Sequence, residues 1–247
     1  MKSVNFHLRP SGLLGAVVEA LDNVSTRGIK GVVGIVDRDY RFPLGKVFER
    51  LDLLCTDKHD LEMMMYETEA FDAVIRECGS EAKVLSWPKG VSGIRAHLYE
   101  QSRQIGYVRL SNEANDSGYC FKNLNYESFV DRSTVTLALE RFIEYLRARW
   151  GQNLSVSIAT YENGRTVATR YSSLSEDGML CRGHDVSEML VIGLRSLWGT
   201  NPAQAYDADD IEKMLRLAYS REDFSKTELS RKILDWYKKF TDEGKYS

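Results

Sequence analysis

The sequence has no apolar run of the roughly 18 residues that a membrane-spanning helix needs, and its longest run, residues 31–36, has only the length of a strand. Its first residues, MKSVNFHLRPSG, contain neither the apolar centre nor the small-residue cleavage site of a secretory signal. We therefore expect a cytoplasmic protein that makes no contact with a membrane.

Cysteine is scarce, and no two cysteines form a Cys-x-x-Cys pair. The sequence therefore offers neither a disulfide framework nor the paired motifs of a zinc finger, and we expect reduced thiols. Cys181 and His184 form a single Cys-x-x-His, which is half of such a zinc site, and we expect a structural role for both. The remaining cysteines are Cys55, Cys78 and Cys120.

A large excess of positive charge is also missing, because 33 Lys and Arg face 36 Asp and Glu, a formal net charge of -3 at pH 7. This balance excludes a chain that coats nucleic acid over its whole surface, but it leaves room for a local basic groove. Basic residues gather over 141–149 and 226–239, where acidic neighbours also fit ordinary solvated helix faces. With 43% hydrophobic and 28% charged residues, the composition is that of a globular chain.

Hydrophobic periodicity predicts strands and helices in alternation over the first third of the chain. Alternating apolar residues indicate a strand over 3–8, and helical spacing indicates a helix over 13–25. Runs rich in Val, Ile and Leu indicate strands over 29–36 and 51–55, the first of them covered on both faces. A helix beginning near Asp60 follows. This order predicts an α/β fold in which helices flank a largely parallel sheet.

The rest of the chain is expected to form a mostly helical C-terminal region. Ser133 is a candidate cap for one helix, and Asp185 with Glu188 forms an Asp-x-x-Glu capping pattern before another. We therefore divide the chain into an α/β domain over 1–85 and a helical domain over 86–247.

Asp37 and Asp39 follow directly after the apolar run 29–36. Side chains two apart on an extended backbone share a face, so both carboxylates can reach one hard divalent cation. In an open α/β sheet, ligands bind beyond the carboxyl ends of the strands. The alternative is that both aspartates stabilise a turn, with Arg38 as their counter-ion.

A second acidic group, TDKHDLE, follows the strand predicted over 51–55. Asp60 and Glu62 can complete a metal shell there, and His59 can act as a general base or contact a phosphate. The alternative is that Asp57 and Asp60 stabilise a helix N-terminus.

Two phosphatase patterns compete with this interpretation. Gly183-His184-Asp185 is typical of His-Asp phosphohydrolases, but the few other histidines do not supply the further ligands, so a structural role is favoured. The haloacid-dehalogenase phosphatases also place Asp-x-Asp after a buried strand, yet Arg41 stands where they usually carry Thr or Val.

Four segments, GIKGVVGIVDRDY, CTDKHDLEMMM, LCRGHDVSEMLVIGLR and LRLAYSREDF, together resemble a bacterial domain-of-unknown-function family with a TOPRIM-like fold. That family includes the TOPRIM nuclease subunit of PARIS anti-phage systems. The resemblance implies a TOPRIM-like α/β fold, a nuclease that hydrolyses DNA or RNA phosphodiesters, and an ATPase partner in a defence system.

The resemblance also implies roles for individual residues. Asp37 and Asp39 match the Asp-x-Asp pair that binds Mg²⁺ or Mn²⁺, and Asp60 and Glu62 match the acids after the next strand. In this assignment Asp37, Asp39 and Glu62 are the catalytic residues, and all four carboxylates are metal ligands. Arg38 and His59, on the same segments, are candidate substrate contacts.

One element of the TOPRIM fold has no counterpart here, namely the strand that ends in Glu-Gly-x-x-Asp. Glu19 lies on the predicted helix and is too close to Asp37 for the two crossovers that this strand would need. We therefore expect the first strand and helix of that fold to be missing, which would weaken or abolish cleavage. The alternatives are a non-catalytic subunit that docks an ATPase or forms a homodimer, and a phosphatase or nucleotide hydrolase.

Overall fold

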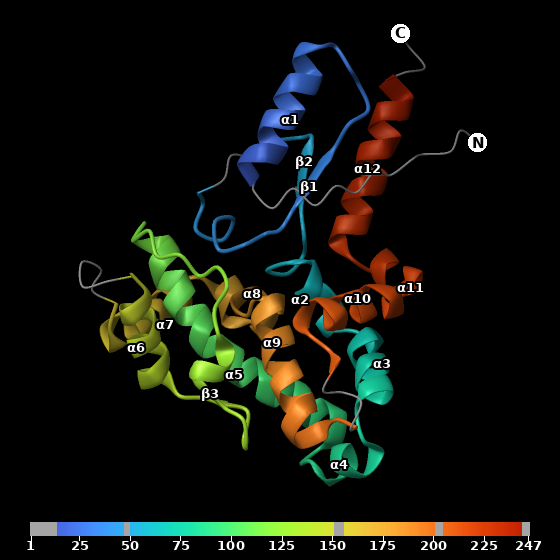
Figure 1. The fold of residues 1–247 in the computed structure, drawn as a ribbon. Coiled ribbons are helices and arrows are strands. Elements are labelled where there is room, and N and C mark those ends of the chain that lie inside the picture. Colours follow the sequence, from blue (N-terminus) through green and yellow to red (C-terminus); the bar gives the residue numbers. More distant parts are fainter. Residues whose placement is uncertain (1–13, 47–49, 151–155, 201–204, 244–247) are drawn as a thin grey trace.

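The computed structural model describes residues 14–46, 50–150, 156–200 and 205–243. Of these residues 66% are helical and only 6% are extended (Figure 1). The chain is therefore a mostly helical protein.

The predicted α/β fold, TOPRIM-like with a largely parallel sheet, is wrong. Strands β1 (Gly34–Val36) and β2 (Leu53–Cys55) do pair in parallel, but no further strand joins them in the described part of the chain. The other two strands, β3 (Val130–Asp131) and β4 (Thr136–Leu137), form a separate antiparallel pair. Two short strands cannot form the sheet around which such a domain is built.

The strand expected over 29–36 is short because most of that apolar run is not buried. Ile29 is 52% exposed and Val32 is 39% exposed, so these side chains gain little from a sheet. Gly31 has a φ of 82°, which breaks the extended backbone ahead of β1. The strand predicted over 3–8 lies outside the described residues.

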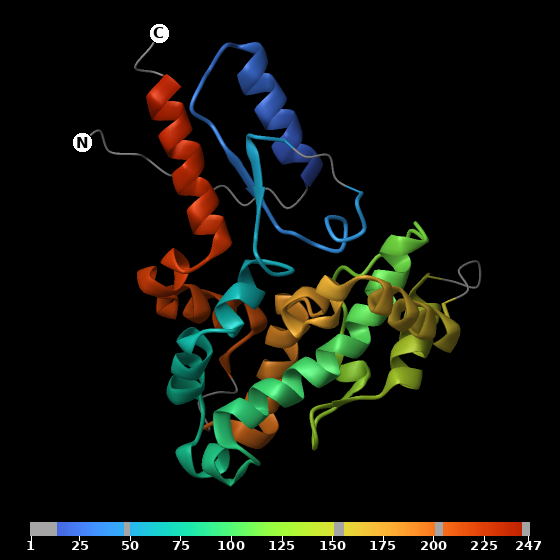
Figure 2. The ribbon, with the colours of Figure 1, turned by 180° about the vertical axis from the view of Figure 1, so that it is seen from behind.

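Two helices cover opposite sides of the β1–β2 pair, as both views show (Figures 1 and 2). Helix α1 (Leu14–Thr26), which confirms the helix predicted over 13–25, packs against β1, and α12 (Glu228–Glu243) packs against β2. Gly34 allows the close approach of α1, because a Cβ there would lie 2.7 Å from Val17 Cγ1. These four elements form the upper part of the molecule in Figure 1.

The lower part of the molecule is a body of helices around α5 (Gly90–Ala114). Helix α7 (Ile158–Arg170) lies very close to α5, because a Cβ on Gly164 would lie 1.8 Å from Tyr107 O. No described helix is both long and apolar enough to cross a membrane. The other helical elements are α2 (Leu61–Tyr66), α3 (Glu69–Cys78), α4 (Glu81–Ser86), η1 (Tyr126–Ser128), α6 (Leu139–Trp150), η2 (Ser172–Ser175), α8 (Asp177–Leu180), α9 (Gly183–Gly193), η3 (Leu194–Trp198), α10 (Ala208–Ala218) and α11 (Arg221–Ser225).

The main hydrophobic core contains residues from both sides of the boundary expected between 85 and 86. Met63 on α2 and Phe71 on α3 are completely buried in the same cluster as Met189 on α9 and Ile211 on α10. The first helices after β2 are thus built into the helical body.

Two predicted helix caps are wrong. Ser133 lies in the turn between β3 and β4, where its N–H donates to Asp131 Oδ1, and α6 begins only at Leu139. Asp185 lies within the first turn of α9, whose N-cap is Arg182, and its carboxylate pairs instead with a distant arginine.

Candidate functional site

The segments that follow β1 and β2 are tied together by hydrogen bonds, so the residues after the two strands lie side by side. The Thr56 N–H donates to Val36 O at 3.1 Å, and the Arg38 N–H donates to Thr56 Oγ1 at 2.9 Å. The Asp39 N–H donates to His59 O at 2.9 Å. Asp39 has a φ of 49°, a left-handed conformation that Asp tolerates better than most residues.

His59 is a buried imidazole at the floor of this junction. Its ring centroid lies 4.5 Å from that of Tyr40, and its backbone N–H donates to Gly178 O at 2.8 Å. Nε2 lies 3.7 Å from Asp39 Oδ1, and Nδ1 has no hydrogen-bond partner among the described residues. Burial lowers the pKa of His59 to about 4, and this effect exceeds the opposite effect of the Asp39 carboxylate. The ring is therefore neutral near pH 7.

Asp60 is a buried carboxylate that joins two helix starts. Oδ1 accepts the Met63 N–H at 2.8 Å and so caps α2, while Oδ2 accepts the Gly183 N–H at 2.9 Å at the start of α9. Burial raises the pKa of Asp60 despite both hydrogen bonds, and the charge of Asp37 raises it further.

Glu62 and Asp37 lie in the same acidic neighbourhood. Burial, followed by the charge of Asp60, raises the pKa of Glu62 to about 7, although Arg216 Nη1 lies 3.4 Å from Glu62 Oε1. Partial desolvation and the charge of Asp39 raise the pKa of Asp37, which is still exposed to solvent. We call Asp37, Asp39, Asp60 and Glu62 the carboxylate cluster. The charges of these side chains act on one another, but among the described residues no three of the four bring ligand atoms within 4.8 Å of one another.

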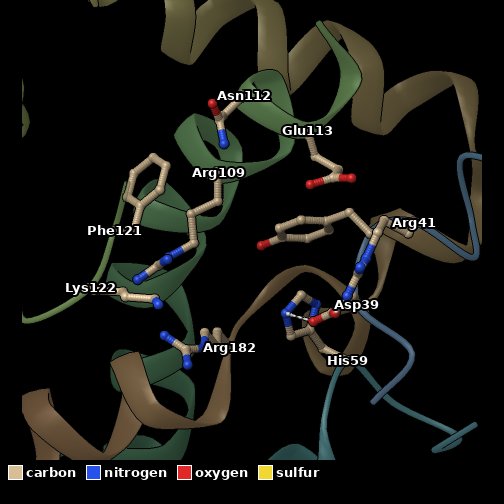
Figure 3. Close-up of a pocket in the computed structure, with 10 residues that line it drawn as sticks. Asp39, Arg41, His59, Arg109, Asn112, Glu113, Phe121, Lys122 and Arg182 are labelled. Atoms are coloured by element: carbon tan, nitrogen blue, oxygen red, sulfur yellow. Dashed lines mark hydrogen bonds and ion pairs between the residues drawn. The ribbon is translucent and has the colours of Figure 1, made fainter. Parts of the chain in front are cut away.

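An open polar cleft of about 280 Å³ adjoins the carboxylate cluster and shares Asp39 with it (Figure 3). Cationic side chains from α5, from the segment after it and from the start of α9 face Asp39, Arg41 and His59 across the cleft. Four cations line it against two carboxylates, so an anion fits this surface better than a cation. The charged lining residues are Arg41, Arg109, Lys122, Arg182, Asp39 and Glu113.

Two of the four cations are largely neutralised by carboxylates. Arg41 pairs with Asp39 at 2.5 Å. Arg109 donates to both oxygens of the completely buried Asp185, at 2.9 and 2.7 Å, and its guanidinium lies 4.6 Å from the Phe121 ring centroid. The Tyr126 hydroxyl also donates to Asp185. This buried pair fixes Arg109 at the wall of the cleft.

Lys122 and Arg182 are the cations best placed to hold a bound anion. Neither lies within 4 Å of a carboxylate in the described part of the chain. Arg182 also lowers the pKa of Asp37 and of Asp60, so its charge is felt in the carboxylate cluster as well as in the cleft. Arg182 therefore connects the two halves of the site.

One of the sequence candidates lies elsewhere. Arg38 does not line the cleft, and its Nε is buried without a hydrogen-bond partner among the described residues. The alternative role of Asp57 and Asp60 at a helix N-terminus is confirmed, because Asp60 caps α2 and the Asp57 carboxylate accepts the N–H groups of Glu228 at 2.6 Å and Leu229 at 2.8 Å at the start of α12.

Sequence reasoning missed the cations of the cleft. Arg109 and Lys122 lie far from Asp39 along the chain, and no local pattern marks them. Arg182 immediately precedes Gly183-His184-Asp185, a recognisable motif. Of the three residues, it is the one that a local sequence pattern could have identified.

The carboxylate cluster suits a hard divalent cation by donor type, because all four side chains offer oxygen and Mg²⁺ commonly uses one or two carboxylates together with water and phosphate. Both Asp60 oxygens already accept backbone N–H groups, and a cation shared by three of these side chains would require them to move closer together. Burial is the main cause of the raised pKa values of Asp37 and Glu62, and neighbouring carboxylates raise them further, an effect that a cation would relieve.

No family model, curated protein or solved structure matched the chain.

Proposed function

We propose that the protein hydrolyses phosphodiester bonds of DNA or RNA with a divalent cation, Mg²⁺ or Mn²⁺. The observation that carries this proposal is the position of Arg182, which lines the cationic cleft and is one of the charges that act on Asp37. Phosphoryl chemistry needs both features together, a site for the cation and fixed positive charge for the phosphate.

The residues have complementary roles in this proposal. Asp37 is the exposed member of the carboxylate cluster and is proposed to bind the cation directly. Asp39, Asp60 and Glu62 supply further negative charge around the cation. Lys122 and Arg182 bind the phosphate in the cleft.

His59 is suited to accept a proton from the attacking water. It lines the cleft as a neutral imidazole whose Nε2 lies 3.7 Å from Asp39 Oδ1, while Nδ1 is buried. General-base catalysis requires such a neutral nitrogen within reach of the nucleophile.

The size of the cleft indicates what it can hold. A volume of about 280 Å³ admits a phosphate with its neighbouring sugar. Comparison of single- and double-stranded substrates decides which form reacts.

The test is cleavage of fluorescently labelled DNA and RNA, single- and double-stranded, with Mg²⁺ or Mn²⁺. Asp37→Asn should lower the rate by at least ~100-fold, the usual cost of removing an electrostatic catalytic group. Asp22→Asn is the matched control, because Asp22 is an exposed aspartate on α1 that pairs with Arg50. Wild-type protein that is inert on every substrate, or an Asp37→Asn variant that cleaves normally, would refute the proposal.

Lys122 and Arg182 need a separate test, since they are proposed to bind rather than to react. Replacing either one by Ala should weaken binding of single-stranded DNA and reduce the dependence of affinity on salt concentration by about one phosphate contact. If both variants bind DNA with the affinity and salt dependence of the wild type, the cleft is not the phosphate-binding site.

The family resemblance supplies the biological setting of the proposal, an anti-phage system with an ATPase partner. Cleavage assays should therefore be repeated with ATP and the product of a neighbouring ATPase gene. Small phosphate esters belong in the same assay, because faster turnover of a monoester would favour the phosphatase alternative.

A second candidate function is a non-catalytic interaction subunit that docks an ATPase or forms a homodimer. Apolar side chains exposed on α12 favour it, since Leu234 is 54%, Tyr237 is 40% and Phe240 is 39% exposed. Leu234→Glu should then weaken assembly in size-exclusion chromatography with light scattering, while Asp37→Asn leaves assembly unchanged.

A further inference from the structure

Helices α9 and α10 bring together one histidine and two carboxylates, none of which lines the cleft. His184 lies on α9, and Asp209 and Glu212 lie three residues apart on one face of α10. One ligand atom from each of the three lies within 4.8 Å of the others. Ligands about 2.1 Å from a shared ion lie some 3 to 4 Å apart, so only a small adjustment would let all three bind one ion.

The histidine is already oriented as a metal ligand would be. His184 Nδ1 lies 2.9 Å from Glu212 Oε1, on the side of the two carboxylates. Its other nitrogen, Nε2, lies 3.6 Å from Glu188 Oε1, one turn further along the same face of α9. A slight approach would form a hydrogen bond between them, and a carboxylate bonded to the far nitrogen of a ligating histidine fixes its tautomer and orientation, as in most histidine metal sites.

Apart from His184 itself, the carboxylates of this group have no cationic partner. In the described part of the chain, no lysine or arginine lies within 4 Å of Asp209 or Glu212. The nearby cations are occupied, because Lys213 pairs with Asp210 and Arg216 pairs with Glu62. The group is also open to solvent, so an ion can enter.

We propose that His184, Asp209 and Glu212 bind a divalent transition-metal ion of the Zn²⁺ class, with Glu188 supporting the imidazole from behind. Mixed nitrogen and carboxylate donors favour Zn²⁺, Co²⁺ or Ni²⁺ over Mg²⁺, which prefers oxygen alone. Three protein ligands leave the fourth position to water. This site shares no residue with the carboxylate cluster, although the charge of Glu212 raises the pKa of Glu62.

The test is calorimetric titration of the untagged, metal-free protein with Zn²⁺, together with visible absorption on adding Co²⁺. Wild-type protein should bind one Zn²⁺ at this site and give the absorption bands of Co²⁺ with a nitrogen ligand. Glu212→Gln and His184→Gln should each abolish this binding, and Glu188→Gln should weaken it by about 10- to 100-fold. Glu222→Gln is the matched control, because Glu222 is an exposed glutamate paired with Lys226.

Thermal unfolding by circular dichroism shows whether each variant is folded. If His184→Gln does not fold, Glu212→Gln carries the test, since Gln preserves the size of the side chain. Asp37→Asn should still bind one Zn²⁺ at the His184 group, and in this background the proposed hydrolytic site contributes nothing. Absence of Zn²⁺ binding in the Asp37→Asn background, or binding there that survives both Glu212→Gln and His184→Gln, would overturn the inference.

Discussion

Acidification should destabilise the protein through His59, because this imidazole must be uncharged in the folded state. Its pKa is 6.5 in an unfolded chain and is lowered to about 4 in the folded protein by burial. The unfolded chain therefore binds a proton between these two values while the folded protein does not. The stability that His59 contributes is full above pH 6.5 and is lost as the pH falls toward 4.

The size of the effect follows from these two pKa values. Lowering the pH from 7 to 5 should cost about 2 kcal/mol of unfolding free energy through His59 alone. Solvent screens this effect little, because His59 is only 3% exposed. Carboxylates also titrate in this range, and the raised pKa of Glu62 works in the opposite direction. The His59 contribution must therefore be isolated with a variant.

The assay is urea unfolding of the wild type and of His59→Gln at pH 7 and pH 5. The wild type should lose about 2 kcal/mol more than the variant between the two pH values, since only the wild type carries the imidazole. NMR titration of the ring gives the pKa directly. Equal losses in the two proteins, or a His59 pKa above 6.5, would refute the reasoning. The Asp39 carboxylate would then outweigh burial.

Three further substitutions test the packing around the site by urea or thermal unfolding. Asp185→Asn should cost about 3 kcal/mol, because it leaves the buried Arg109 guanidinium without its counter-charge, and an unchanged midpoint would contradict the buried pair. Gly164→Ala should cost about 1 to 3 kcal/mol, because its methyl group would overlap Tyr107 O, and a neutral effect would mean that α5 and α7 are less close. Asp57→Ala should cost about 1 kcal/mol by uncapping α12, and hydrogen exchange should quicken at the first turn of that helix and nowhere else.

Periodicity located individual elements better than it predicted the fold. The helix over 13–25 and the positions of β1 and β2 follow from local patterns, as expected for short-range preferences. The sheet failed because Val/Ile content alone does not decide burial, and Ile29 and Val32 remain exposed. Whether a short apolar run extends into a sheet depends on partners elsewhere in the chain.

Part of the candidate site could be predicted from the sequence and part could not. Asp37, Asp39, Asp60 and Glu62 could be grouped, because acids that follow neighbouring parallel strands lie at the same edge of the strand pair. The cations of the cleft come from α5, the segment after it and α9, and only tertiary packing places them opposite Asp39. The contact between α10 and His184 also depends on tertiary packing, so it could not be predicted from the sequence. Contacts between helices far apart in the chain do not change the hydrophobic periodicity of either helix.

The central claim is that the carboxylate cluster holds a divalent cation beside the cleft. The most direct measurement is Mn²⁺ binding at pH 8 by electron paramagnetic resonance. Glu212→Gln serves as the background, so that the His184 group cannot contribute. One Mn²⁺ should bind to the Glu212→Gln protein, and Mg²⁺ should displace it. The double variant that also carries Asp37→Asn should bind Mn²⁺ at least ~10-fold more weakly. An affinity that Asp37→Asn does not change, or no bound Mn²⁺ at all, would contradict the account.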